Sequence, residues 1–322
     1  MRTRIVVLTL LVLAPAGIAR AAGGYPFGAE AGPEGVVTPT STVRYVTIAS
    51  GTNTVLERIQ RAGGQVLAER TLHGPLGIPA VATDGTAGGL SANGGTLVLI
   101  RPLARFPVAE TPLRIVDTRT LHVSRISLKG TFAFDAVSPD GRSLYLTQYP
   151  TRDVNRYVVR RFDVARGDLQ PGAIVDRRNP AEQMRGVPLT RITSSGGRWA
   201  YTLYDGAGHE PFIHALDTSS RRAFCIDLGG LEGSPRLYSL RLVLGQDGLR
   251  VVDRDETVAT VDTTTFRVVT GAPPALASSR PGSTTGGHGG GLWLALAGAI
   301  GVIALGFATV RLTRRRQSVV SR

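Results

Sequence analysis

The chain has 322 residues, enough for one large domain or two ordinary ones, and its 37 Lys and Arg outnumber 24 Asp and Glu to give a formal net charge of +13. Eight of the basic residues lie in the two terminal segments, and the 29 that remain are scattered among the 24 acids rather than massed in one run, so we expect no nucleic-acid partner. The single cysteine, Cys225, excludes an internal disulfide and predicts a small apolar side chain in a strand, with an intermolecular disulfide as the alternative.

The first 21 residues have the pattern of a secretory signal peptide. Arg2 and Arg4 precede an apolar stretch that Pro15 interrupts, and Ala19-Arg-Ala21 has the small-x-small form of a cleavage site. We therefore predict a signal peptide at 1–21, with an uncleaved anchor as the alternative, followed by an N-terminal extension at 22–41.

A turn flanked by apolar strands recurs along the next part of the chain. Ser91-Ala-Asn-Gly-Gly-Thr-Leu-Val-Leu99 aligns without gaps on Ser138-Pro-Asp-Gly-Arg-Ser-Leu-Tyr-Leu146, and the pattern returns near Gly196 and Asp247. Asn-Gly and Asp-Gly between alternating apolar residues are hairpin signals, because glycine adopts the positive φ that tight turns need. Each such turn predicts a β-hairpin.

A second motif, an aspartate that ends a strand, follows each of these turns. Asp117, Asp163, Asp217 and Asp262 occupy the same place in four successive repeats. An aspartate there accepts a backbone N–H two residues later, which closes an Asx-turn. We therefore assign these residues a structural role rather than a catalytic one.

Four strands in about 50 residues is the repeat of a β-propeller blade. Phe134-Asp-Ala-Val-Ser-Pro-Asp-Gly-Arg-Ser-Leu-Tyr-Leu146 resembles the TolB-type and WD40-like propeller repeats, and Tyr45-Val-Thr-Ile-Ala-Ser-Gly-Thr-Asn-Thr-Val55 resembles the YVTN repeat of bacterial surface propellers. Two departures are that Ile48 replaces the asparagine of that motif and that the family often has seven blades. The resemblance implies an all-β, β-propeller-like ectodomain over 42–271.

The repeats leave room for about five four-stranded blades, which we expect at 36–73, 78–129, 131–177, 187–229 and 236–271. The first blade has no clear inner strand, and Gly35-Val-Val-Thr38 is the candidate to supply it. If the ring stays incomplete, a sheet edge is left that needs a partner.

The end of the chain predicts a membrane anchor. Residues 272–291 are rich in Gly, Ser and Pro and predict a flexible linker. Residues 292–310 are uncharged and mostly apolar, long enough to cross a bilayer as a helix. The arginines of 311–322 then place a short tail in the cytoplasm. We expect a single-pass cell-membrane protein with its N-terminal domain on the extracytoplasmic side.

Candidate binding residues come from the inner strands, which converge on the axis of a propeller. Asp135, Arg191 and Arg241 each precede a repeat turn by a few residues, so we predict them at the mouth of the central channel, where they either pair with one another or bind a ligand. Tyr145, Trp199 and Tyr201 follow the turns and are expected to pack between blades.

No convincing catalytic or metal-binding motif is present. His209 and His214 are five residues apart, Pro211 between them excludes a helix, and we interpret them as surface loop histidines rather than metal ligands. The Ser194-Ser195 pair belongs to a hairpin turn. We therefore predict no catalytic residue, no metal and no cofactor.

The function that follows is a binding or scaffold module, displayed outside the membrane, for a protein or a cell-envelope ligand. Two alternatives remain open. Some relatives in this propeller family resemble lactone hydrolases, and the resemblance implies an acid or metal cluster at the channel, with Asp, Glu and His side chains converging at one mouth. The chain would otherwise serve as a subunit of a membrane complex.

Overall fold

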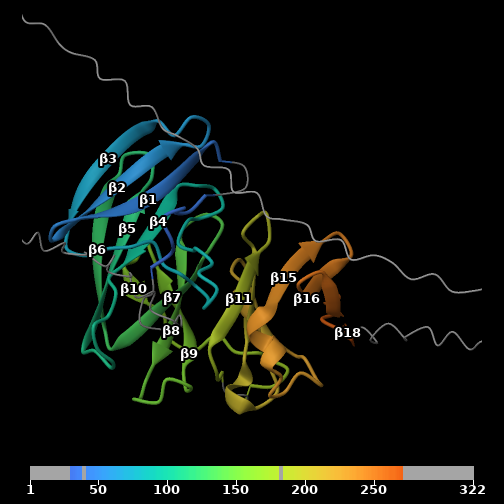
Figure 1. The fold of residues 1–322 in the computed structure, drawn as a ribbon. Helices are drawn as coiled ribbons and strands as arrows, with labels where there is room; N and C mark the ends of the chain where they lie inside the picture. The colour runs from blue at the N-terminus through green and yellow to red at the C-terminus, as the bar shows by residue number, and fades with distance from the viewer. Residues whose placement is uncertain (1–29, 38–40, 181–183, 271–322) are drawn as a thin grey trace, which may run out of the picture. The chain divides into compact units, whose positions relative to one another are not determined.

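The computed structural model describes residues 30–37, 41–180 and 184–270, and these form five antiparallel sheets in chain order (Figure 1). Three sheets have four strands and two have three, so the all-β class is confirmed. The first two sheets comprise β1 (Val43–Ser50), β2 (Asn53–Gln60) and β3 (Val66–His73), then β4 (Thr96–Ile100), β5 (Glu110–Asp117) and β6 (His122–Lys129). The third comprises β7 (Thr131–Val137), β8 (Ser143–Tyr149), β9 (Val158–Asp163) and β10 (Asp168–Leu169). The last two comprise β11 (Pro188–Thr193), β12 (Trp199–Tyr204), β13 (Phe212–Asp217) and β14 (Arg222–Asp227), then β15 (Leu240–Gly245), β16 (Gly248–Asp253), β17 (Glu256–Val261) and β18 (Val268–Thr270).

In the described part of the chain, helix is limited to two short 3-10 segments, η1 (Gly206–Gly208) and η2 (Pro235–Ser239). Within the described residues, no helix has the length and apolar character needed to cross a membrane. The predicted signal peptide (1–21), linker (272–291), membrane helix (292–310) and tail (311–322) lie outside the described residues.

The repeated motifs form the turns that the sequence predicted. Asn93 and Asp140 each accept the hydroxyl of the serine two residues earlier, and the backbone N–H two residues later donates to the same oxygen. The four strand-ending aspartates each accept the backbone N–H groups two and three residues later, which confirms the Asx-turns; they are Asp117, Asp163, Asp217 and Asp262. Side-chain oxygens thus replace the hydrogen bonds that the reversing backbone cannot make.

The prediction of four regular strands is wrong for the first two sheets. Val36 exchanges both backbone hydrogen bonds with Tyr45, so the segment expected to supply the inner strand does lie beside β1, but it pairs only as an isolated bridge. In the second sheet, β4 pairs with separate points at Gly77 and Leu90. Pro79, Gly85 and Gly89 lie between them, and such residues interrupt a regular strand.

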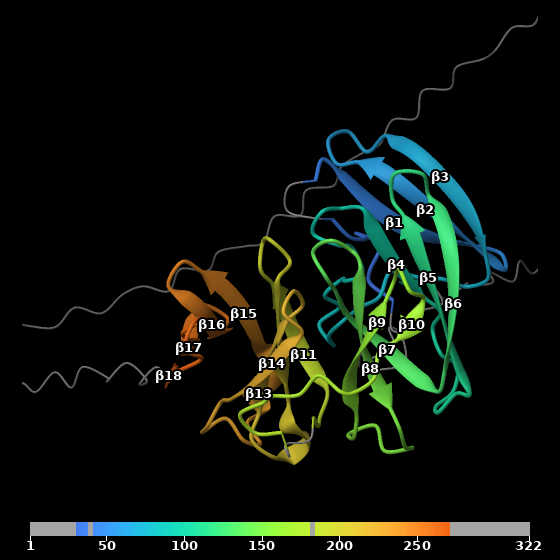
Figure 2. The same ribbon diagram turned by 180° about the vertical axis from the view of Figure 1, so that it is seen from behind.

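Each sheet packs on the next one in chain order through apolar side chains. Tyr145 of the third sheet is fully buried, and its hydroxyl donates to the carbonyl of Thr218 in the fourth at 2.6 Å. Trp199 stacks on Tyr201 within the fourth sheet and meets Phe266 of the fifth edge-on. The predicted inter-sheet packing of these aromatics is therefore confirmed. Figures 1 and 2 both place the first and last sheets at opposite ends of this series.

Candidate functional site

A cavity of about 330 Å³ lies where β7 and β11 meet the segments that flank β1 and β4. Val36 comes from the segment beside β1, residues 86–90 from the segment beside β4, Asp135 from β7 and Arg191 from β11. Thr193, Ser194 and Ser195 of the fourth sheet also line it, and we call it the central cavity.

Asp135 lines the cavity at an irregularity in the pairing of its strand. The pairing of β7 with β8 shifts register between Phe134 and Ala136, so Asp135 is the extra residue of a β-bulge. A bulge turns one side chain away from the regular alternation of a strand. The sequence placed Asp135 in an inner strand correctly, but nothing in its pattern signals the bulge.

Arg191 is the partner of Asp135. One guanidinium nitrogen of Arg191 donates to the carboxylate of Asp135 and another donates to the backbone carbonyl of the same residue. Its Nε donates to Thr202 Oγ1 at 2.7 Å, on the directly opposed residue of β12. Only 4% of the Arg191 side chain and 3% of the Asp135 side chain are exposed. The two charges therefore neutralise each other away from water, although Asp135 Oδ2 accepts no hydrogen bond from the described residues.

Tyrosines fill the space on a further side of this ion pair. A much smaller cavity, of about 30 Å³, shares Asp135 with the central cavity and is also lined by Tyr149, Tyr157 and Tyr204. The rings of Tyr149 and Tyr157 lie 5.5 Å apart, and those of Tyr157 and Tyr204 lie 6.0 Å apart, between centroids. Burial raises the pKa of all three hydroxyls, so they remain protonated at neutral pH.

The third predicted residue, Arg241, does not join the other two. It lies in the inner strand β15, as expected, but its side chain is exposed and donates to the carbonyl of Leu240 at 2.7 Å. It is not among the described residues that line the central cavity. Of the three candidates, the structure brings together Asp135 and Arg191 only.

The two histidines of the sequence pattern also lie in different surroundings. His209 is exposed after η1, whereas His214 lies in β13 with 1% of its surface exposed, so the prediction of a surface loop is wrong for His214. Strand β13 begins at Phe212, directly after Pro211, and therefore carries His214 into the interior. Among the described residues, no group of three or more His, Cys, Asp or Glu side chains is arranged to hold a metal ion.

Burial also sets the chemistry of His214. Loss of hydration lowers the pKa of its imidazole to about 4, so the ring is neutral at physiological pH. No local pattern in the sequence signals this burial, because it results from the tertiary packing of β13.

No model of a known protein family matches the sequence, and no curated protein matches it. Solved structures with a similar arrangement include TolB from Acinetobacter baumannii, with 12% identity, a TM-score of 0.38, and coverage of 68% of this chain and 50% of that one. The β-propeller domain of Cps50 (Swd1) from Myceliophteria thermophila has 9% identity, a TM-score of 0.39, and coverage of 75% of this chain and 72% of that one. A TolB structure from Agrobacterium tumefaciens has 14% identity and a TM-score of 0.39, over 60% of this chain and 64% of that one. The chain thus spans less than two thirds of either TolB structure, and likeness at this level establishes neither a family nor an activity.

Proposed function

We propose that this protein is a membrane-anchored, extracytoplasmic module of five propeller-type blades that binds a protein or a cell-envelope ligand at the mouth of the central cavity. The observation that carries the proposal is the paired state of Asp135 and Arg191 within a cavity otherwise lined by hydroxyl, backbone and apolar groups. Such a lining suits recognition, because it offers hydrogen bonds and apolar contact without a reactive group.

The groups around the opening support binding by contact. Thr193 and Ser195 are exposed hydroxyl residues, and Val37 of the same lining leaves 41% of its surface exposed. An exposed valine among hydroxyls gives a partner both an apolar contact and directional hydrogen bonds. The fixed ion pair holds the wall behind them in one arrangement.

The hydrolase alternative needs several acids and histidines at one mouth. Among the described lining residues, Asp135 is the acid, and its charge is already bound to Arg191. A general base must be within reach of substrate, and this carboxylate is almost completely buried and bonded to Arg191. The lining therefore favours recognition over hydrolysis.

Photo-crosslinking in cells that produce the full-length chain tests the proposal. The photoreactive amino acid p-benzoylphenylalanine is placed at Ser195, in the cavity lining, or at Glu69, which is exposed on β3 and outside that lining. We expect a discrete adduct from position 195 and none from position 69. The substitution Thr193→Trp, which narrows the opening, should abolish the adduct.

Digestion of the adduct identifies the class of ligand. A protease-sensitive partner indicates a protein, and a partner released by a wall-degrading enzyme indicates envelope polymer. Equal adducts at positions 195 and 69, or no adduct at position 195, would contradict binding at this mouth.

A further inference from the structure

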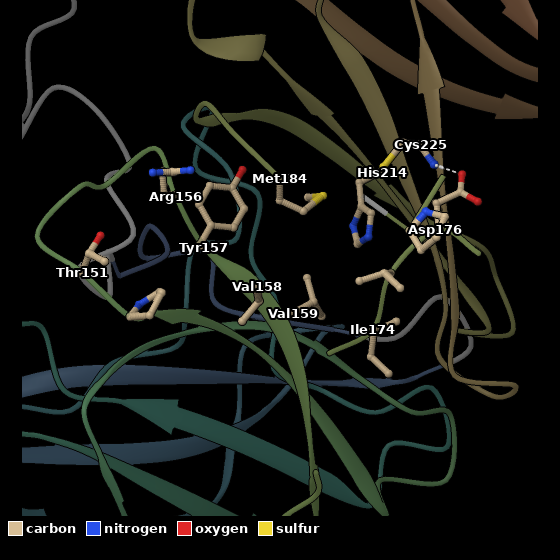
Figure 3. A pocket seen from close by; sticks show the side chains of 13 residues that line it. Thr151, Arg156, Tyr157, Val158, Val159, Ile174, Asp176, Met184, His214 and Cys225 are labelled. Atoms are coloured by element: carbon tan, nitrogen blue, oxygen red, sulfur yellow. Dashed lines mark hydrogen bonds between the residues drawn. The ribbon is translucent and has the colours of Figure 1, made fainter. Parts of the chain in front are cut away.

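A second and larger cavity, of about 400 Å³, lies between the third and fourth sheets (Figure 3). One wall is formed by Tyr157 and the start of β9, and another by His214 of β13 and Cys225 of β14. Ile174 pairs with Val159 of β9, and Asp176 forms a parallel bridge to Ala223 of β14, so residues 174–176 join the two sheets along this cavity. Hydrogen bonds therefore fix its walls, and we call it the lateral cavity.

Most polar groups around the lateral cavity already have partners. Asp176 Oδ2 accepts Arg178 Nη2 at 2.6 Å and the backbone N–H of Cys225 at 2.9 Å. The hydroxyl of Tyr157 donates to the carbonyl of Gly186 at 3.0 Å. These groups hold the surrounding backbone in place and are not available to a ligand.

His214 differs from its neighbours in this respect. Its Nδ1 is buried and makes no hydrogen bond with any described residue, although the ring is almost completely buried. Figure 3 shows the imidazole among the side chains that surround the lateral cavity. A buried polar atom without a partner costs about 1–3 kcal/mol, so a group inside the cavity that bonds to it would be stabilising.

The remaining lining is mostly apolar, apart from the exposed residues Thr151 and Arg156. Val158, Val159, Ile174, Val175 and Met184 supply hydrocarbon and thioether surface, and the volume is within the range of small-molecule sites. A charged ligand would leave water with little compensation beside His214, because Asp176 is already paired with Arg178 and the exposed Arg156 has an interaction of its own. The cavity therefore favours a neutral, mainly apolar molecule.

We propose that the lateral cavity binds a small, neutral, mainly apolar molecule whose hydroxyl group hydrogen-bonds to His214. A hydroxyl fits because it both donates and accepts, and so satisfies either tautomer of a neutral imidazole. This site is separate from the mouth of the central cavity. Binding of a small molecule here does not require that a partner binds at that mouth.

Methionine NMR gives a direct readout of this cavity. The chain has two methionines, Met1 and Met184, so [methyl-13C]methionine labelling of the full-length protein places one reporter in the cavity lining. The protein, in lipid nanodiscs at pH 7, is titrated with 2-naphthol and with naphthalene, which has the same apolar body without the hydroxyl. Both probes shift a nearby methyl signal through their ring currents.

The variant His214→Phe isolates the hydrogen bond. We expect 2-naphthol to shift the Met184 signal at about tenfold lower concentration in the natural protein than in His214→Phe, the effect of one hydrogen bond. Naphthalene should act at similar concentrations in both. Both proteins are measured in the same nanodiscs, so the amount of probe lost to the lipid is equal and does not affect the ratio of the two concentrations.

A second variant, Ile174→Phe, fills part of the cavity and should weaken both probes without removing His214. An unchanged Met184 signal with either probe, or an advantage of 2-naphthol that survives in His214→Phe, would overturn the proposal. If His214→Phe does not fold, Ile174→Phe still tests the proposal. A probe that shifts the Met184 signal equally in the natural protein and in Ile174→Phe must bind outside the cavity, and that result would also overturn the proposal.

Discussion

Arg191 and Asp135, which are 56 residues apart in the sequence, form one buried ion pair that links inner strand β11 of the fourth sheet to inner strand β7 of the third. The pair depends on the bulge at Asp135 and on Thr202, which holds Arg191 Nε. It therefore joins two sheets and also defines the wall of the central cavity.

Removal of one partner should be severely destabilising. In Arg191→Met the carboxylate of Asp135 remains buried without a counter-charge, and we expect the free energy of unfolding to fall by about 3–5 kcal/mol. Denaturant unfolding of the full-length protein, followed by tryptophan fluorescence, measures this loss.

The double variant Asp135→Leu, Arg191→Met removes both charges and should recover a large part of that stability. The matched control is Arg241→Met, an exposed arginine of the equivalent inner strand, which should change the free energy of unfolding by less than about 0.5 kcal/mol. A similar loss in Arg191→Met and Arg241→Met would contradict a special role for the buried pair.

The aspartate turns differ in how much they contribute to stability. Asp217 accepts the backbone N–H groups of Ser219 and Ser220 and two hydrogen bonds from Arg198, with 3% of its side chain exposed. Asp217→Ala leaves these donors unpaired, and we expect a loss of roughly 2–3 kcal/mol in the free energy of unfolding. Thermal and denaturant unfolding measure it.

Asp262→Ala is the comparison, because Asp262 makes the same two backbone contacts at an exposed turn without an arginine partner among the described residues. Water replaces the lost acceptor there, so the loss should be clearly smaller. Equal losses in the two variants would show that burial and Arg198 add nothing to the turn.

The sequence predicted the parts of this fold that local chemistry determines. Asn93, Asp140 and the four strand-ending aspartates form hydrogen bonds within a few residues of themselves, so their spacing was enough to predict the turns. The inner-strand position of Asp135 and Arg191 followed from the same repeat.

The candidate site was harder to predict from the sequence, because contacts between residues distant in the sequence determine which side chains it contains. The bulge at Asp135 exists only in the register of β7 against β8, and Arg241 occupies the same repeat position but remains exposed. His214 looked like a loop residue because Pro211 precedes it closely, whereas β13 starts immediately after that proline and buries the ring. Contacts between segments distant in sequence leave no local pattern to recognise.

The predicted membrane topology can be tested with the single natural cysteine removed. In a Cys225→Ser background, Ser279→Cys lies in the predicted linker and Ser318→Cys in the predicted tail. A membrane-impermeant maleimide applied to intact cells should label the first and should label the second only after permeabilisation, because the arginines at 311–316 favour the cytoplasmic side. Labelling of both positions, or of the tail alone, would contradict the proposed anchor.

The buried histidine should make stability depend on pH. Burial lowers the pKa of His214 to about 4, Asp135 and Asp176 oppose that shift, and Arg191 adds to it. The imidazole of the unfolded chain binds its proton near pH 6.5, whereas that of the folded chain stays neutral until about pH 4. As pH falls through this interval only the unfolded state gains a proton, so this contribution to the free energy of unfolding decreases by roughly 3 kcal/mol.

His214→Phe removes this proton-binding group and His209→Phe, an exposed histidine in the same segment, is the matched control. The difference in the free energy of unfolding between the natural protein and His214→Phe should therefore change by roughly 3 kcal/mol from pH 7 to pH 4, while other titrating groups cancel. The same difference for His209→Phe should stay nearly constant. A constant difference for His214→Phe would mean that the ring is hydrated in the folded protein, and that the lateral cavity is open to water at this residue.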